Sequence, residues 1–278
     1  AEYQAIDNFY TTTIYEKGAE LIRMLHTLLG QERFMRGMAT YVRRFDGTAA
    51  TTEDFVQSVV DGAAEDGEPL GFDPELFKRW YHQAGTPELT VQRSWDAAKG
   101  ALSLELHQSI PQTSGQDEKQ PLVLPIAVAL VGEQGRIGDE QLLVMDGKHA
   151  SLSLKGKPGA EAPALSLLRR FSAPVNVQME QSLQESLQLL AHDDDPYSRW
   201  NAGQRLARQV LLARANGQPD ATVETALIEA LRQRLTAYDG AAGQDLAVLL
   251  ALPGTAELEA LQSPVDPPAL YAAQRDWV

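Results

Sequence analysis

The sequence predicts a multi-domain α+β protein in which a helical segment is followed by an all-β domain and then by an array of helices. The apolar residues recur at helical spacing up to about residue 87, alternate with a period of two from about 88, and return to helical spacing from about 180. At 278 residues the chain is long enough for two or three domains with separate cores. We therefore predict domains at residues 1–87, 88–179 and 180–278.

Local signals mark where the helices of the first segment begin and end. Apolar residues between 21 and 29 share one face, and Gly30 should end that helix. Thr51 is a predicted N-cap, because two acidic residues follow it in the first turn. Asp73 followed by Pro74 predicts the start of a last short helix.

The middle segment has the pattern of short strands. Alternating apolar residues flank a turn at 96–100, which predicts a hairpin. Further strands are expected at 122–131, 141–145, 151–155 and 165–177. Six or seven short strands in about 90 residues, without a helical period between them, indicate a small β-sandwich.

In the last segment, apolar residues at helical spacing predict five helices between residues 183 and 261. The sequence shows no fixed-period repeat there. The acidic run at 193–195 precedes Pro196. We interpret this run as a helix cap and solvated loop, although three carboxylates could also bind a cation.

Composition excludes several classes of protein. The formal charge of -14 disfavours nucleic acid and anionic membranes as partners, because phosphate binding needs a basic surface. No run of eighteen apolar residues and no charged-then-apolar leader occurs, so neither a membrane span nor secretion is expected. The absence of cysteine excludes disulfides and thiolate metal sites and fits a cytoplasmic location.

The most specific chemistry lies at the beginning of the chain. Tyr10 and Tyr15 are five residues apart, and the threonines at 11–13 could cap the helix that follows. From spacing alone, a tyrosine at a helix entrance is more often a packing residue than a catalyst.

Residues 8–11 (NFYT) and 14–20 (IYEKGAE) resemble a signature of the zinc aminopeptidase N family, in its bacterial alanyl aminopeptidase branch. The resemblance continues in the same order through five further stretches, at residues 22–30, 46–51, 79–87, 118–121 and 171–175. It implies the helical half of a thermolysin-like catalytic domain, then an immunoglobulin-like sandwich, then the start of an all-α helical array.

The resemblance also implies an activity, the release of N-terminal amino acids from peptides by a zinc held on a His-Glu-x-x-His helix and a later glutamate. No two of the five histidines are four residues apart, so this chain lacks the zinc ligands. We therefore interpret it as a fragment of a longer enzyme, inactive alone, whose partners are peptide substrates and the missing segments of that enzyme. The alternative is a non-catalytic protein-binding module on an aminopeptidase-derived scaffold.

Matching the family signature assigns roles to the two tyrosines. The tyrosine at the position of Tyr15 donates a hydrogen bond to the oxyanion that develops on the scissile carbonyl. Tyr10 matches a substrate-binding residue on the wall of the active site. Among other candidates, we expect Lys17 to extend into solvent and His26 to be a core histidine bonded to backbone. We expect Arg79, Trp80 and Tyr81 to pack the first segment against the sandwich.

Overall fold

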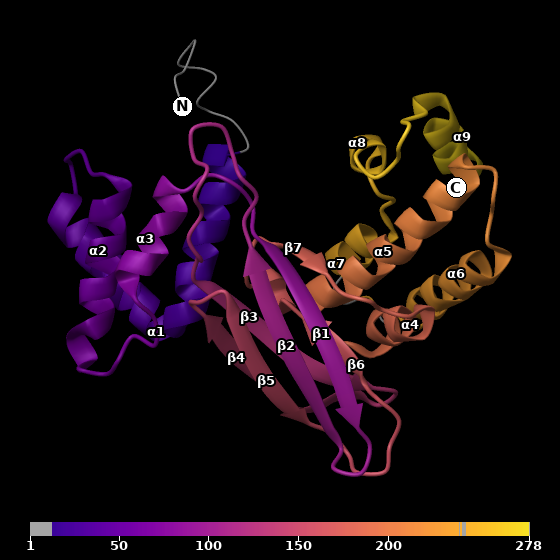
Figure 1. Cartoon of the computed structure of the whole chain (residues 1–278), viewed down its shortest axis with the longest axis horizontal. Helices are drawn as coiled ribbons and strands as arrows, with labels where there is room; N and C mark the ends of the chain where they lie inside the picture. Colours follow the sequence, from indigo (N-terminus) through magenta and orange to yellow (C-terminus); the bar gives the residue numbers. More distant parts are fainter. Residues whose placement is uncertain (1–12, 239, 241–242, 278) are drawn as a thin grey trace. The chain divides into compact units, whose positions relative to one another are not determined.

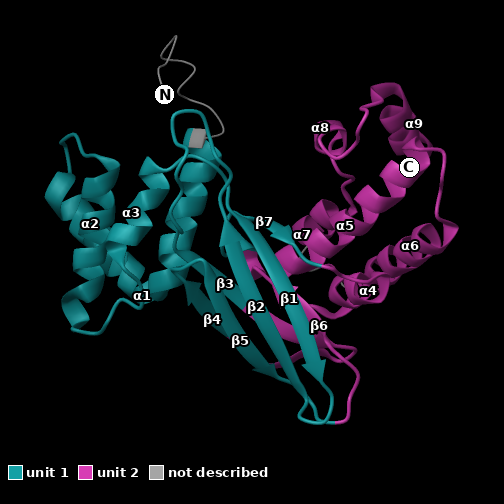
Figure 2. Ribbon diagram, in the orientation of Figure 1, with its two compact units in different colours: residues 1–127, 141–158, 171–179 teal, residues 128–140, 159–170, 180–278 magenta. Residues whose placement is uncertain are grey.

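The computed structural model describes residues 13–238, 240 and 243–277, which form two compact units (Figures 1 and 2). The first unit contains residues 1–127, 141–158 and 171–179, and the second contains residues 128–140, 159–170 and 180–278. No helix in the described part of the chain is long and apolar enough to cross a membrane.

The first segment is helical, as predicted. Its elements are η2 (Thr13–Lys17), α1 (Gly18–Phe45), α2 (Thr52–Ala63), η3 (Ala64–Asp66) and α3 (Pro74–His82). Thr51 forms a capping box with Asp54 at the start of α2, and Asp73 caps α3 with Pro74 in its first turn, which confirms both predicted caps.

Gly30 breaks the first helix but does not end it. Its φ of 74° and ψ of 163° are not helical, yet the chain returns to helix at once and α1 continues to Phe45. A single glycine at positive φ interrupts the backbone hydrogen bonds without requiring a loop. The predicted helix end at this residue is therefore confirmed as a break in helical geometry, although α1 as a whole continues to Phe45.

Helices α1 and α2 approach closely at two glycines. A Cβ atom on Gly37 would lie 2.4 Å from the carbonyl oxygen of Val59, and one on Gly62 would lie 2.8 Å from that of Arg36. The backbones of the two helices therefore meet where larger residues would hold them apart.

Seven strands follow and form two sheets. They are β1 (Glu88–Asp96), β2 (Ala101–Ser109), β3 (Leu124–Gly132), β4 (Gly135–Met145), β5 (His149–Lys155), β6 (Ala164–Leu167) and β7 (Asn176–Gln178). One sheet has the order β5-β2-β1-β7 and the other β4-β3-β6. β1 and β2 form the predicted antiparallel hairpin, while β1 and β7 pair in parallel. Four alternate residues of β2 are buried, as expected for a strand with one solvated face.

The single strand predicted at 165–177 is wrong. The chain forms β6, then the 3-10 turn η4 (Arg169–Phe171), then β7. Leu168 and Arg170 have φ of 56°, a left-handed conformation that cannot continue a strand.

Contacts within the first unit join α3 to the segment before β3. The indole Nε1 of Trp80 donates to the carbonyl oxygen of Val123 at 2.9 Å, and the guanidinium of Arg79 donates to that of Pro121. The amide of Gln83 exchanges two hydrogen bonds with the backbone of Gln120, each 2.9 Å long. These contacts confirm the packing role predicted for Arg79 and Trp80.

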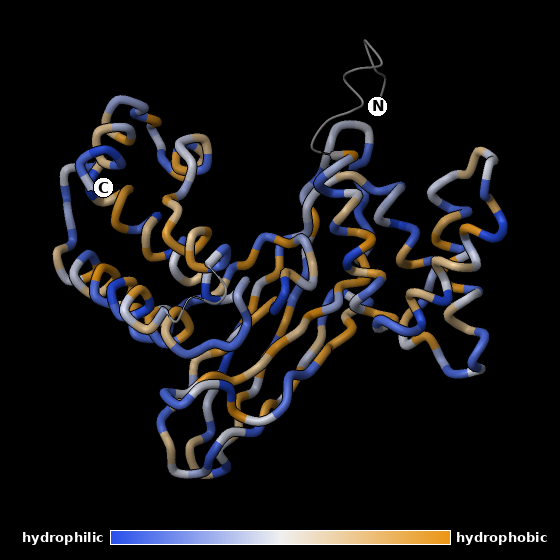
Figure 3. Tube along the Cα trace, turned by 180° about the vertical axis from the view of Figure 1, so that it is seen from behind, coloured by the Kyte–Doolittle hydropathy of each residue, from blue (hydrophilic) through white to orange (hydrophobic). Residues whose placement is uncertain are grey.

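The last segment is an array of helices: α4 (Leu183–His192), α5 (Pro196–Ala215), α6 (Ala221–Thr236), α7 (Gly243–Leu250), α8 (Thr255–Glu259) and α9 (Pro267–Trp277). The five predicted helices are present, and α9 was not predicted. One buried aliphatic cluster includes Leu190, Leu206 and Leu227, and a second cluster joins Leu211 to Leu258 and Leu270 of α8 and α9. Figure 3 shows hydrophobic positions alternating with hydrophilic ones along these helices.

Candidate functional site

Tyr15 lies in η2, a single turn of π-helix that leads directly into α1. Its side chain is 63% exposed, so it is not a core packing residue. Short π-helical turns are frequent at functional sites, because the wider turn shifts side chains out of the α-helical register. Tyr10 and the threonines at 11 and 12 lie outside the described residues.

Two residues after Tyr15, Lys17 turns toward the protein. Its ammonium group lies 5.6 Å from the ring centroid of Trp80, in a cation-π contact. Burial lowers the pKa of Lys17 below its usual value of 10.5. The expectation that this side chain extends into solvent is therefore wrong, since the indole face offers an apolar surface that also attracts the charge.

Tyr81 and His82 follow Trp80 on α3, and the packing of Tyr81 against the sandwich stays a prediction. Burial, with a smaller effect of Glu53, raises the pKa of Tyr81 to about 12, so its phenol stays neutral. His82 pairs with Glu53 at 3.2 Å on the surface.

His26 differs from its prediction. Its Nε2 lies 2.6 Å from the Oε1 of Gln31, so its partner is a side chain and not the backbone. Its ring also meets that of Phe34 edge to face, with centroids 5.2 Å apart.

Within residues 13–238, 240 and 243–277, no group of three or more histidine, cysteine, aspartate or glutamate side chains is arranged to hold a metal ion. These residues therefore do not fit a zinc site of the three-ligand kind that the resemblance implies.

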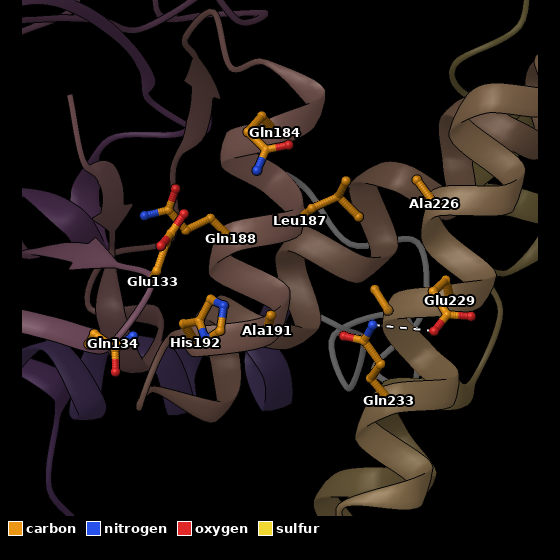
Figure 4. A pocket seen from close by; sticks show the side chains of 11 residues that line it. Glu133, Gln134, Gln184, Leu187, Gln188, Ala191, His192, Ala226, Glu229 and Gln233 are labelled. Atoms are coloured by element: carbon orange, nitrogen blue, oxygen red, sulfur yellow. Dashed lines mark hydrogen bonds between the residues drawn. The ribbon is translucent and has the colours of Figure 1, made fainter. Parts of the chain in front are cut away.

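The second unit carries a pocket of about 520 Å³, between the turn after β3 and helices α4 and α6 (Figure 4). Six of its eleven lining residues carry a side-chain amide or carboxylate: Glu133, Gln134, Gln184, Gln188, Glu229 and Gln233. The others are Leu187, Ala191, His192, Ala226 and Ala230. Glu229 is already engaged, by Gln233 at 3.3 Å and by Arg232 at 3.5 Å. The pocket can offer hydrogen bonds, but it presents no nucleophile paired with a base.

The same unit contains a buried ion cluster centred on Arg169, whose side chain is only 4% exposed. Its guanidinium donates to Asp193 at 2.7 Å, to Glu140 at 2.8 Å and to Asp194, and also to the hydroxyl of Ser166 at 2.9 Å. The cluster joins β4, the end of β6 and the connection between α4 and α5.

Asp195 completes the cluster through the backbone. Its carboxylate accepts from the amide of Ser198 at 2.9 Å and so caps α5, and it also accepts from the amide of Arg170 at 3.0 Å. The second contact holds a residue in the left-handed conformation. The predicted cap is confirmed, but the predicted solvated loop is wrong, because Asp193 and Asp195 are each only 3% exposed.

Electrostatics in the cluster favour the charged forms. Burial alone would lower the pKa of Arg169, but the hydrogen bonds that it donates to Asp194 and Glu140 outweigh burial and raise that pKa. Burial likewise opposes ionisation of Asp194, yet Arg169 and Arg136 together lower the pKa of this carboxyl to about 2. The cluster therefore has a structural role, since it holds these segments of the second unit together. In the sequence, only the basic pair at 169–170 and the acidic run at 193–195 could have indicated it.

Comparison with known proteins shows which protein family the chain resembles. Residues 1–72 match the peptidase family M1 domain, 85–180 match a domain of unknown function with an Ig-like fold (DUF3458), and 183–278 match its ARM-repeat companion (DUF3458_C). Over 275 residues, 99% of the chain, it is 42% identical to aminopeptidase N of Caulobacter vibrioides. The chain belongs to the aminopeptidase N family.

Two further comparisons agree with this assignment. The chain is 36% identical to aminopeptidase N of Escherichia coli over 95% of its length. The crystal structure of Legionella pneumophila aminopeptidase A in complex with aspartic acid matches 98% of the chain with a TM-score of 0.78 and 27% identity. The predicted order of a peptidase segment, an immunoglobulin-like domain and a helical array is thereby confirmed, while the domain boundaries at 87 and 179 stay predictions.

The chain spans about a third of the length of these proteins, 31% of each of the two curated relatives and 30% of the Legionella chain.

Proposed function

We propose that the chain is part of a zinc-dependent aminopeptidase that releases N-terminal amino acids from peptides, with the broad, alanyl-type preference of the bacterial branch. Its similarity to proteins named aminopeptidase N over 95% or more of its length carries this proposal. The zinc would be held by a part of the enzyme other than the described residues, since these lack a three-donor group.

The contribution of this chain to the reaction is the hydroxyl of Tyr15. During attack on the scissile carbonyl, negative charge develops on its oxygen, and a phenol that donates a hydrogen bond there lowers the barrier. The exposed position of Tyr15 in a π-helical turn supports this role, because the residue is not packed into the core. Tyr10 is proposed as a substrate-side wall residue.

The test is the substitution Tyr15→Phe in the complete enzyme that carries this chain. We expect folding and zinc content to persist, and kcat to fall roughly 100- to 1000-fold, which corresponds to about 2.7 to 4 kcal/mol for one oxyanion donor. KM should change less, since the interaction strengthens mainly in the transition state.

Tyr271→Phe is a matched control, because Tyr271 has the same exposed fraction of 63%. It should leave kcat unchanged, and Tyr10→Phe should have a much smaller effect than Tyr15→Phe. If Tyr10→Phe abolishes turnover while Tyr15→Phe changes kcat by less than about threefold, the roles of the two tyrosines are reversed.

The chain by itself should not hydrolyse an aminoacyl-anilide, nor retain one zinc per molecule after dialysis against a chelator. Retained zinc together with activity would contradict the proposed fragment. A cytoplasmic location stays a prediction.

A further inference from the structure

Two histidines lie opposite each other on neighbouring strands of the four-stranded sheet. His107 on β2 and His149 on β5 are partners in the antiparallel register. Their ring centroids are 4.6 Å apart, with 41° between the ring planes. Both side chains are exposed, on the opposite face from the buried leucines of β2.

The ladder hydrogen bonds place this pair where side chains approach most closely. The amide of Gln108 donates to the carbonyl oxygen of Lys148 at 2.9 Å, so these two residues form a hydrogen-bonded pair. His107 and His149 therefore occupy the adjacent non-hydrogen-bonded position, where opposite Cα atoms are about 4.5 Å apart.

Buried contacts fix the backbone beneath both rings. Gln108 is 2% exposed, and its side-chain nitrogen Nε2 donates to the backbone carbonyl oxygens of Leu122 at 2.9 Å and Gly147 at 2.7 Å. Its side-chain oxygen accepts from the amide of Leu122 at 3.0 Å. One satisfied buried amide thus ties β2, next to His107, to the turn that precedes His149.

We propose that His107 and His149 form a binding site for a divalent transition metal ion that prefers imidazole, namely Cu²⁺, Ni²⁺ or Zn²⁺. A metal–nitrogen bond of about 2.0–2.1 Å places two coordinating nitrogens about 3 Å apart. Rings held 4.6 Å apart between centroids reach that separation by rotation of their side chains.

The surroundings determine what kind of site this is. The next pair along the same face is Glu105 opposite Ser151, and Thr90 of β1 lies opposite His107 on the other side. Because no third donor joins the two imidazoles among the described residues, water completes the coordination. The ion should exchange readily, unlike a catalytic zinc, and it should hold the edge strand β5 to β2.

The test is titration of the metal-free 278-residue chain with CuCl₂ or NiCl₂, followed by calorimetry. We expect one equivalent to bind, Cu²⁺ more tightly than Ni²⁺, and the EPR spectrum of the copper complex to show two coordinated nitrogens. His107→Gln and His149→Gln should each weaken binding at least tenfold.

His192→Gln is the matched control, because His192 is an exposed histidine on α4 with no histidine across from it. It should bind as the wild type does. Equal loss in His192→Gln, undiminished binding in a variant that lacks both His107 and His149, or one coordinated nitrogen in the wild-type EPR spectrum would each overturn the site. The EPR measurement needs no variant, so the proposal remains testable if a substitution impairs folding.

Discussion

Replacing Arg169 by methionine removes the centre of the buried ion cluster while keeping an unbranched side chain of similar length. The substitution leaves Asp193, whose side chain is fully buried, without its counter-ion, and one of its carboxylate oxygens already has no hydrogen-bond partner. Removing one partner of a buried ion pair typically costs about 3–5 kcal/mol. We expect Arg169→Met to lower the free energy of unfolding by that amount.

The measurement is urea unfolding at pH 7, with hydrogen exchange in α4 and α5 to locate the effect. Arg170→Met is the control, since the side chain of Arg170 is 56% exposed and its ion pair with Glu140 lies at the surface. That variant should lose less than about 1 kcal/mol.

A second variant separates lost pairing from lost packing. Adding Asp193→Asn to Arg169→Met removes the uncompensated charge, so part of the lost stability should return. A decrease of less than about 1 kcal/mol in the free energy of unfolding of Arg169→Met would refute the view that the Arg169–Asp193 pair stabilises this cluster. A double variant less stable than the single variant would refute it as well.

Three further outcomes follow from particular contacts. Because the pKa of Asp194 is lowered to about 2, its stabilising contribution is complete above its ordinary value of 3.8 and is lost as pH falls through 2; acid unfolding of Asp194→Asn should lack that loss. Gly37→Ala should cost about 1–3 kcal/mol in thermal unfolding, because its Cβ would strike the backbone of α2, whereas Gly18→Ala has open space and should not destabilise. Thr51→Ala should cost about 1 kcal/mol in urea unfolding through loss of the capping box, and Thr52→Ala almost nothing.

Local signals were sufficient for most element starts and for the family. Thr51 and Asp73 cap their helices by accepting a hydrogen bond from a backbone amide two or three residues later. Such a cap involves only residues close together in the chain, so the sequence can predict it. The alternation along β2 indicated its buried face, since the side-chain period of a strand is two. The motif around Tyr15 indicated the family, which the comparisons confirmed.

Apolar periodicity predicts the order of helical, β and helical segments correctly, because it depends only on residues that are neighbours in the chain. The positions of charged groups depend on how the chain folds. Arg169 is an arginine that local pattern would leave in solvent, yet it is buried because Asp193, 24 residues later, lies beside it. The pairing of His107 with His149 likewise exists only after the register of β2 and β5 is set. Contacts between residues far apart in the chain have no period, so no local pattern predicts them.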